Sequence, residues 1–275
     1  MGGAEAPERI RAMSWNLWWR FGADWRRRQP AIVSTLDTVR PDVVGLQEVW
    51  VTGETNQPKW LAERLGMHSV LATPSLPPPP VPPESPDQAG VDVGVAVLSR
   101  WPIVDMTQHS LPSRPDAPTV ALSVVVDHRN GPLHVIACCL EWERDFADVH
   151  LSQTRALAGV VTDSALDGPL PVLLTGDLNA PPGTPQIEAL TDVMVDAWVA
   201  AGRSTEGGRT LSSANPFAPR AAWQLDHRID YVMARPGMPG GSVAVERAIV
   251  AGGPRDGVHP SDHYAVVADF RVPAS

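Results

Sequence analysis

The segment PVLLTGDLNAPP, residues 171–182, decides how the rest of the sequence is interpreted. Its first part, residues 171–177, has the length and apolar character of a buried strand, and it ends in an acid. Asp177 and Asn179 stand directly at that end. Taken alone, either residue is more often a turn former. The ends of strands in α/β sheets are also where ligand sites form. Whether this segment indicates a ligand site therefore depends on which residues stand at the ends of the other strands.

Polar residues stand at the ends of four other apolar segments in the same way. They are Asn16 in IRAMSWNLWW (residues 10–19), Glu48 in DVVGLQEV (residues 42–49), Asp230 in RIDYV, and Asp262 with His263 in SDH, just before the last apolar segment. If these segments converge, four carboxylates share one pocket. Carboxylates packed closely raise one another's pKa or require a cation. The donors are oxygens with one histidine, which suits Mg²⁺, Mn²⁺ or Ca²⁺ better than zinc.

The order of the apolar segments indicates an α/β architecture. Residues 10–19 alternate as a strand does, residues 30–39 have helical spacing that Pro41 stops, and residues 42–49 form a short buried strand. Further predicted elements are strands at residues 91–99, 119–127, 133–140, 225–233 and 264–272, and a helix at 147–166. Asn130-Gly131 predicts a hairpin between two of these strands. Residues 76–90 are rich in proline and fit either an interdomain linker or a surface loop.

The composition is that of a chain with a sizeable core. Of its 275 residues, 43% are hydrophobic and 19% are charged, which excludes wholesale disorder. No apolar run approaches ~20 residues, so no transmembrane segment is expected. Residues 1–11 lack the apolar stretch of a secretory signal, and residues 270–275 show no anchor. The adjacent Cys138 and Cys139 fit a buried strand in a reducing compartment, and we expect a cytoplasmic protein.

The net charge weighs against one class of partner. The 22 Lys and Arg against 31 Asp and Glu give −9, whereas a nucleic-acid binder usually carries a basic stripe. The one basic run, residues 26–28, is more often a solvated helix face. An acidic protein repels polyanions at long range, although a local cationic cleft can override that repulsion. Long nucleic acids are therefore disfavoured modestly and are not excluded.

The order of the motifs resembles a known superfamily. WNLWW, LQEVW, GVAVLSRWPI, GDLNAPP, RIDYV and SDHYAV occur in the order found in the endonuclease/exonuclease/phosphatase superfamily, which includes DNase I-like nucleases, abasic-site endonucleases, inositol-polyphosphate phosphatases and bacterial sphingomyelinases. The resemblance spans residues 13–270, and GDLN with a downstream SDH is specific when WN and QE lie upstream. It implies an α/β fold, a four-layered sandwich of two packed mixed β-sheets flanked by helices. Residues 1–275 would form a single domain, with the proline-rich residues 74–90 as a surface loop.

The resemblance also implies a metal site. Glu48 resembles the principal metal ligand of the superfamily, and Asp262 resembles the aspartate close to the metal. Asn16 would sit beside the metal and form hydrogen bonds to the groups around it. The expected cofactor is Mg²⁺ or Mn²⁺. Such an ion would offset negative charge on the phosphate and on the leaving oxygen.

The resemblance assigns the catalytic roles to the remaining motifs. Asp177 would orient or deprotonate the attacking water, a step worth typically ~10²–10⁴-fold in rate. Asn179 would hold that aspartate or the phosphate. His263 would contact the scissile phosphate, and a cationic histidine stabilises the charge that grows in the transition state. Asp230 would hold the tautomer of His263 and favour its protonated form.

Two positions depart from the superfamily pattern. Many members carry a histidine where HVIACCLEW places Cys139, and a cysteine cannot donate to phosphate as histidine can. Trp18 stands where abasic endonucleases tend to carry a carboxylate. By strand alternation it should point the same way as Asn16, either as an aromatic wall beside a base, sugar or lipid group or as packing for a covering loop. Arg228, the first residue of RIDYV, is a further candidate to line the cleft and contact substrate.

The leading hypothesis is a metal-dependent hydrolase that cleaves a phosphodiester or phosphomonoester by in-line attack of an activated water. The alternative is a catalytically weak metal- or phosphate-binding protein of the same fold, which Cys139 favours. A nuclease predicts a local cationic cleft and strong salt dependence; the candidate cations are Arg114, Arg144, Arg220 and Arg228. A small phosphate or phospholipid substrate suits the acidic surface better, and fold analogy does not decide between them. We expect a monomer.

Overall fold

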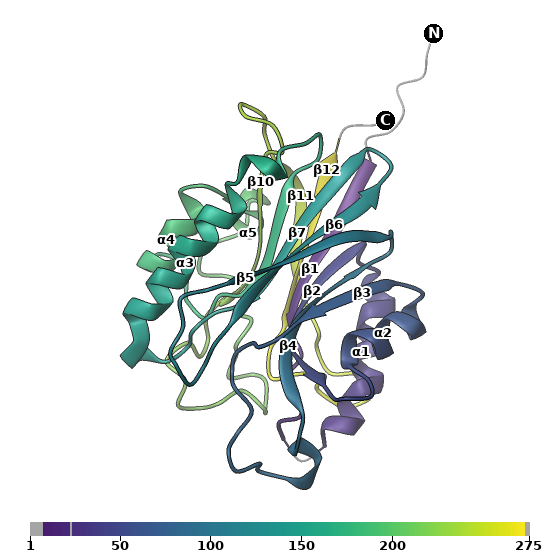
Figure 1. Ribbon diagram of the computed structural model, residues 1–275, viewed down its shortest axis with the longest axis vertical. Helices are drawn as coiled ribbons and strands as arrows, with labels where there is room; N and C mark the ends of the chain where they lie inside the picture. The colour runs from purple at the N-terminus through teal and green to yellow at the C-terminus, as the bar shows by residue number, and fades with distance from the viewer. Residues whose placement is uncertain (1–7, 23, 273–275) are drawn as a thin grey trace.

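A computed structural model describes residues 8–22 and 24–272. Two six-stranded sheets lie face to face, with helices on both outer sides (Figure 1). The strand order is β11-β12-β1-β2-β4-β3 in sheet A and β5-β6-β7-β8-β10-β9 in sheet B. Each sheet contains one parallel pair, β1 with β2 and β7 with β8. The predicted four-layered sandwich of two mixed sheets is confirmed, while the expectations for residues 1–7 and 273–275 lie outside the described residues.

Sheet A is formed from both ends of the chain. Its strands are β1 (Glu8–Asn16), β2 (Val43–Val51), β3 (His68–Ala72), β4 (Asp92–Ser99), β11 (Ala244–Ala251) and β12 (Ala265–Val272). The first strand is shorter than the alternation to residue 19 predicts. It ends at Asn16 because the chain then turns, with positive φ values of 57° at Trp18 and 29° at Trp19.

Sheet B is formed by the middle of the chain. Its strands are β5 (Ile103–Ser110), β6 (Val120–His128), β7 (Gly131–Cys139), β8 (Val172–Asp177), β9 (Val195–Asp196) and β10 (Asp230–Arg235). The hairpin predicted at Asn130-Gly131 joins β6 to β7, and Gly131 has the positive φ of 115° that such a turn requires. The prediction of a strand from residue 225 is wrong. Residues 225–229 bond instead to the loop before them, where Ile229 N donates to Thr210 Oγ1 at 3.0 Å.

The helices cover the outer faces of the two sheets (Figure 1). They are α1 (Trp25–Val39), α2 (Gln57–Leu65), α3 (Ala147–Val161), α4 (Pro185–Thr191) and α5 (Ala197–Ala200), with short 3₁₀ turns η1 (Pro86–Gln88), η2 (Arg144–Phe146) and η3 (Ser164–Leu166). Helix α1 ends before Pro41 as predicted, but it begins five residues before Pro30. Its first turn is held from outside, since Trp25 Nε1 donates to Asp87 Oδ2 at 3.2 Å. Among the described residues, no helix combines the length and apolar character needed to cross a bilayer.

Three apolar clusters separate the four layers. Val95 and Leu173 belong to the cluster between the sheets. Ile32 of α1 and Leu61 of α2 pack on the outer face of sheet A, and Leu157 of α3 packs on that of sheet B. The two cysteines belong to different clusters: Cys139 lies in the cluster between the sheets, and Cys138 lies in the cluster under α3. Both thiols are free and buried, as predicted for a strand cysteine.

The two sheets are in close contact near the site. A Cβ atom at Gly45 of β2 would lie only 1.8 Å from Thr175 Oγ1 of β8, so glycine is required there. Thr175 is fixed in turn, because its hydroxyl donates to Ile136 O at 3.0 Å. Asp177 lies two residues beyond Thr175 on the same strand, so this contact sets the distance between the polar strand ends of the two sheets.

The proline-rich residues 74–90 connect β3 to β4 and are tied to the start of α1. Asp87 forms an ion pair with Arg26, and Gln88 Nε2 donates to Arg20 O at 3.1 Å. Near the beginning of the segment, Pro77 lines the pocket described below. The segment therefore forms part of the wall of the candidate site.

Candidate active site

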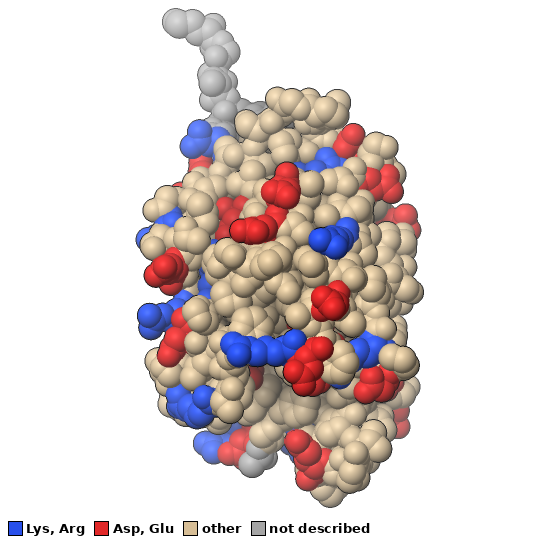
Figure 2. Space-filling model, turned by 90° about the vertical axis from the view of Figure 1, so that its left-hand side faces the viewer, with Lys and Arg blue, Asp and Glu red and all other residues tan. Residues whose placement is uncertain are grey.

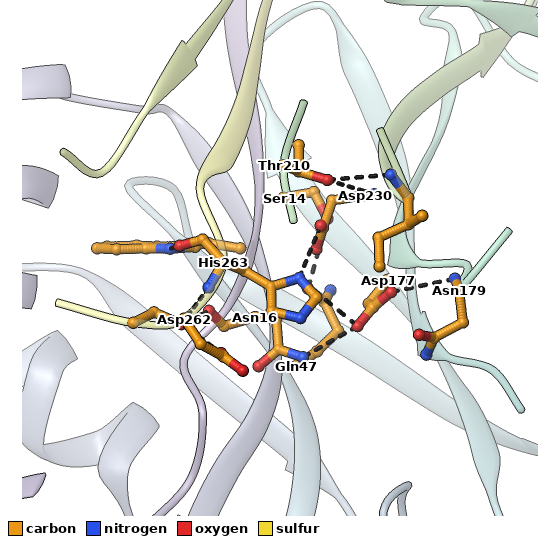
Figure 3. Close-up of polar contacts among 12 residues, drawn as sticks. Ser14, Asn16, Gln47, Asp177, Asn179, Thr210, Asp230, Asp262 and His263 are labelled. Carbon is orange, nitrogen blue, oxygen red and sulfur yellow. Dashed lines mark hydrogen bonds and ion pairs between the residues drawn. The ribbon is translucent and has the colours of Figure 1, made fainter. Parts of the chain in front are cut away.

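The polar strand ends of both sheets meet in one pocket at the same end of the sandwich. Sheet A contributes Asn16 and Glu48, and residues 262–263 precede its strand β12; sheet B contributes Asp177 and Asp230. Figure 3 shows Asn16, Asp177, Asp230, Asp262 and His263 side by side. All of these are buried or half-buried. The pocket has a volume of about 270 Å³, and five of the predicted catalytic and metal-binding residues line it: Glu48, Asp177, Asn179, Asp262 and His263. The convergence predicted from the strand ends is thus what the structure contains.

Two of the site residues have unusual backbone conformations. Glu48 and Asn179 each have φ of 50°, a region that asparagine tolerates better than most side chains. At Glu48, the register between β2 and β4 shifts between Leu46 and Val49. A bulge of this kind re-aims a side chain, and a strained residue costs on the order of 1–3 kcal/mol. Strand alternation in the sequence does not reveal this feature.

Asn16 links the carboxylates of the two sheets. Its Nδ2 donates to Glu48 Oε1 at 2.8 Å and to Asp177 Oδ2 at 3.0 Å. Its Oδ1 accepts a hydrogen bond from Trp18 N at 2.8 Å. The amide is therefore held at both ends. This arrangement supports a positioning role for Asn16 beside a metal site rather than a role as an oxygen ligand.

The end of β8 is locked by several hydrogen bonds. Asn179 N donates to Asp177 Oδ1 at 3.1 Å, and Asn179 Nδ2 donates to Leu140 O at 3.0 Å. Between them, His150 Nε2 donates to Leu178 O at 2.8 Å. Asp177 thus receives donors on both carboxylate oxygens, from Asn179 and from Asn16. Its orientation toward the pocket is fixed before any ligand arrives.

His263 is held by Asp230 and faces Asp177 (Figure 3). Its Nδ1 lies 2.9 Å from Asp230 Oδ2 and 3.9 Å from Asp177 Oδ2. Because a carboxylate only accepts, Nδ1 carries the proton. The backbone of this segment is fixed by Ser261, whose hydroxyl donates to Asn16 O at 2.7 Å and accepts from His263 N at 3.1 Å. Ser261 was not among the residues predicted from the sequence, although it stands directly before the predicted pair.

Burial and mutual repulsion raise the pKa of the site carboxylates. Burial and the charge of Asp262 raise the pKa of Glu48 to about 8. Burial and Asp230 raise the pKa of Asp177 to about 7, and burial also raises the pKa of Asp262. Burial alone would lower the pKa of His263, but the surrounding carboxylates raise it well above its usual value. The histidine is therefore cationic near neutral pH.

Arg28 is a second buried cation that was not among the site residues predicted from the sequence. The run at residues 26–28 was predicted to be a solvated helix face, but Arg28 is only 1% exposed. Its guanidinium donates to the carbonyls of Leu17, Trp18, Trp19, Phe21 and Pro260. Burial lowers its pKa to about 10, while Asp262 and Glu48 act in the opposite direction. Arg28 therefore shapes the turn after β1 and places positive charge behind the site.

The charge balance of the pocket fits a divalent cation. When all four carboxylates are ionised, they exceed the two buried cations of the described cluster, His263 and Arg28, by two negative charges. Without a cation their raised pKa values keep part of this charge protonated, and a divalent ion would favour the ionised forms. Glu48 Oε2 is buried without a hydrogen-bond partner in the described part of the chain. Ligand atoms of Asp177, Asp230 and His263 lie within 4.8 Å of one another, but His263 and Asp230 already bond to each other. The unpartnered oxygen of Glu48 is thus the better indication of where an ion would bind.

Aromatic and apolar side chains form the rest of the pocket wall. Trp18 lines the pocket and stacks on Phe217 from the loop before β10, with ring centroids 5.0 Å apart. It therefore both lines the pocket and packs against a covering loop. Cys139 also lines the pocket, but burial raises the pKa of its thiol well above the usual value. A protonated thiol is a poor nucleophile.

The structure does not bring Arg228 to the pocket. Its guanidinium donates to Asp196 Oδ2 at 2.7 Å, lies 4.4 Å from the ring centroid of Tyr231 and is almost fully buried. The substrate contact predicted for Arg228 is therefore replaced by a structural role. Arg114 is engaged similarly, since it forms ion pairs with Glu141 and with another acid of the same loop at 3.0 Å each.

A family model described as the endonuclease/exonuclease/phosphatase family matches residues 13–263. The chain belongs to this family. Among solved structures, an endonuclease/exonuclease/phosphatase from Beutenbergia cavernae DSM 12333 is 25% identical with a TM-score of 0.69, and the match covers 97% of this chain and 72% of that chain. D. rerio TDP2 complexed with single strand DNA product is 16% identical with a TM-score of 0.74, covering 96% and 99%. The human Nocturnin catalytic domain with bound sulfate anion is 19% identical with a TM-score of 0.70, covering 96% and 94%.

The resemblance predicted from the motif order is thus confirmed, and so is the fold of the endonuclease/exonuclease/phosphatase family. No curated protein matches the chain. Members of this family hydrolyse phosphate esters, and the divalent metals that they commonly use agree with the acidic cluster around Asp177 and His263.

Proposed function

We propose that the protein is a Mg²⁺- or Mn²⁺-dependent phosphoesterase that cleaves its substrate by in-line attack of water. The observation that carries this proposal is the arrangement of four buried carboxylates around one cationic histidine, with Glu48 Oε2 lacking a partner among the described residues. Glu48 and Asp262 would hold the ion. When bound, such an ion offsets charge on the phosphate and the leaving oxygen.

The remaining residues provide the proton transfers and the orientation. Asp177, held by Asn16 and Asn179, is placed to accept a proton from the attacking water. A raised pKa suits this role, because a general base works best when its pKa lies near the operating pH. His263 uses Nδ1 for Asp230, which leaves Nε2 to donate to the phosphate. Negative charge develops on the phosphate as the transition state forms, and the fixed Nε2–H of His263 would stabilise that charge.

The test uses bis-p-nitrophenyl phosphate and p-nitrophenyl phosphate with and without Mg²⁺ or Mn²⁺. We expect metal-dependent release of p-nitrophenol and a loss of ~10²–10⁴-fold in kcat for Asp177→Asn. The matched control is Asp105→Asn, which makes the same change at an exposed position on the edge strand β5. A preference for the diester or for the monoester assigns the subclass.

A second outcome corresponds to the alternative of a binding protein. In that case Mn²⁺ binds, as followed by electron paramagnetic resonance, but neither ester is cleaved. Turnover of Asp177→Asn equal to that of the wild type would instead show that another group activates the water. Circular dichroism melts of each variant separate a catalytic loss from a folding defect.

A further inference from the structure

A second hollow adjoins the catalytic pocket. Its volume is about 530 Å³, and four residues, Trp142, Pro219, Ala222 and Gln224, line both hollows. The two hollows therefore adjoin along these residues. An ester bound across this border would have its phosphate in the first pocket and the rest of the molecule in the second.

The wall between the hollows is built of fixed side chains. Trp223 Nε1 and Gln224 Nε2 both donate to Trp142 O at 3.0 Å. On the other side of this loop, Glu141 Oε1 accepts hydrogen bonds from Trp142 N at 3.0 Å and from Glu143 N at 3.1 Å. The carboxylate of Glu141 is itself buried and paired with an arginine. A wall that is already ordered loses little entropy when a ligand binds.

The surfaces in the second hollow are planar. Trp142 and Trp223 are half-buried and line this hollow, as does Arg144, whose guanidinium lies 5.2 Å from the ring centroid of Trp223. Indole and guanidinium planes stack on flat rings, with a contribution from the ring quadrupole. The chemistry of this hollow thus matches a single aromatic or heteroaromatic ring.

The surroundings do not match a long nucleic acid. Among the described residues that line the catalytic pocket, none is a lysine or an arginine. Of the four arginines predicted to form a cationic cleft, Arg114 and Arg228 are ion-paired, Arg220 donates to Ser213 O at 2.6 Å, and Arg144 stacks on Trp223. The face in Figure 2 shows acidic and basic side chains interspersed, without a continuous basic band. A strand of nucleic acid needs several phosphate contacts along its length.

We propose that the second hollow is a subsite for one planar ring of a small phosphate ester, with its phosphate in the catalytic pocket. The proposal rests on the proposed function only in placing the phosphate. Trp223 is the specificity-determining residue, because its indole forms the stacking surface and its Nε1 holds the wall. A polynucleotide is the competing ligand, and the test includes it.

Binding is measured by isothermal titration calorimetry in the presence of Mn²⁺, with methyl phosphate and phenyl phosphate as probes. The two share the phosphate and differ in the ring. We expect phenyl phosphate to bind about tenfold more tightly, the fold-change that corresponds to ~1.4 kcal/mol and falls within the range for one stacked ring. Trp223→Ala reduces this ratio to below about twofold, and Trp223→Leu, which keeps apolar volume without a ring, does the same.

The control variant is Trp60→Ala. Trp60 carries a stacked arginine like Trp223, with Arg64 lying 3.9 Å from its ring centroid, but it packs against the outer face of sheet A. We expect this variant to keep the wild-type ratio of the two affinities.

Three outcomes overturn the proposal. They are equal affinities of the wild type for the two probes, no detectable binding of phenyl phosphate, and an unchanged ratio in the folded Trp223 variants. A single-stranded oligonucleotide that binds more tightly than phenyl phosphate, with steep salt dependence, also overturns it, since that result identifies an extended polyanion as ligand. Because calorimetry does not require turnover, failure of the proposed hydrolysis and failure of the subsite are separate results.

Discussion

The packing behind Asp177 predicts a specific dependence of stability on pH. His150 of α3 is 3% exposed, and its Nε2 donates to Leu178 O. Burial lowers its pKa from 6.5 to about 4. As the pH falls, the unfolded chain binds a proton at this residue before the folded chain does. The neutral histidine therefore costs no stability above pH ~6.5, and stability is lost progressively as the pH falls toward ~4.

The magnitude follows from the difference between the two pKa values, 6.5 minus about 4, or about 2.5. At about 1.36 kcal/mol for each pH unit, the complete loss is about 3 kcal/mol. Between pH 8 and pH 5 the linkage relation gives a loss of about 2 kcal/mol, because pH 5 still lies above the pKa of the folded state and only part of the interval between the two pKa values has been crossed. Such a loss is a sizeable fraction of the ~5–15 kcal/mol that stabilises a typical protein.

The assay is urea denaturation of the wild type and His150→Gln at pH 8 and pH 5 in EDTA, followed by tryptophan fluorescence. Glutamine keeps an N–H donor for Leu178 O but does not titrate. Other buried groups, including Asp177, contribute equally to both proteins and cancel in the difference. We expect the difference in free energy of unfolding between the two proteins to change by about 2 kcal/mol in favour of the variant at the lower pH. Parallel pH profiles would refute the reasoning.

Three further predictions concern packing. Gly45→Ala should lower the free energy of unfolding by ~1–3 kcal/mol, since a Cβ meets the facing sheet; an unaltered denaturation midpoint would show that the sheets can separate there. Arg228→Ala should cost ~3–5 kcal/mol by leaving Asp196 buried and unpaired, whereas a raised KM with wild-type stability would return Arg228 to substrate binding. Cys138 and Cys139 should not react with a thiol reagent until the protein unfolds, because both are buried and have raised pKa values; fast labelling of the native protein would contradict this.

The site could be predicted from the sequence because its residues interrupt strong patterns. Glu48, Asp177 and Asp230 are acids within or at the ends of otherwise apolar strands. Burying a charge is costly unless it is paired or binds a cation, so an acid at such a position indicates a functional site. The strands concerned are central in their sheets and buried on both faces, so their apolar runs are long and clear. Burial of these strands on both faces therefore produces the apolar runs and also makes the acids stand out in the sequence.

The structural features that were not predicted from the sequence do not arise from strands buried on both faces. β5 and β11 are edge strands. The residues of β5 are mostly exposed and only one residue of β11 is buried, so neither sequence has the apolar alternation of a strand with one buried face. The position of Trp18 depends on a turn with positive φ, which strand periodicity cannot anticipate. Arg28 is buried by carbonyls from a segment that only tertiary folding brings near, and nothing distinguishes it locally from its two exposed neighbours.

The division of the site between the two sheets has a consequence for folding. Sheet B is one continuous stretch, residues 103–235, placed between the two parts of the chain that form sheet A. Asn16 and Glu48 come from one sheet, Asp177 and Asp230 from the other, so neither sheet holds the complete set of proposed catalytic groups. If the proposed hydrolysis occurs, its return during refolding would report the docking of the sheets and should lag behind the circular dichroism signal of strand formation.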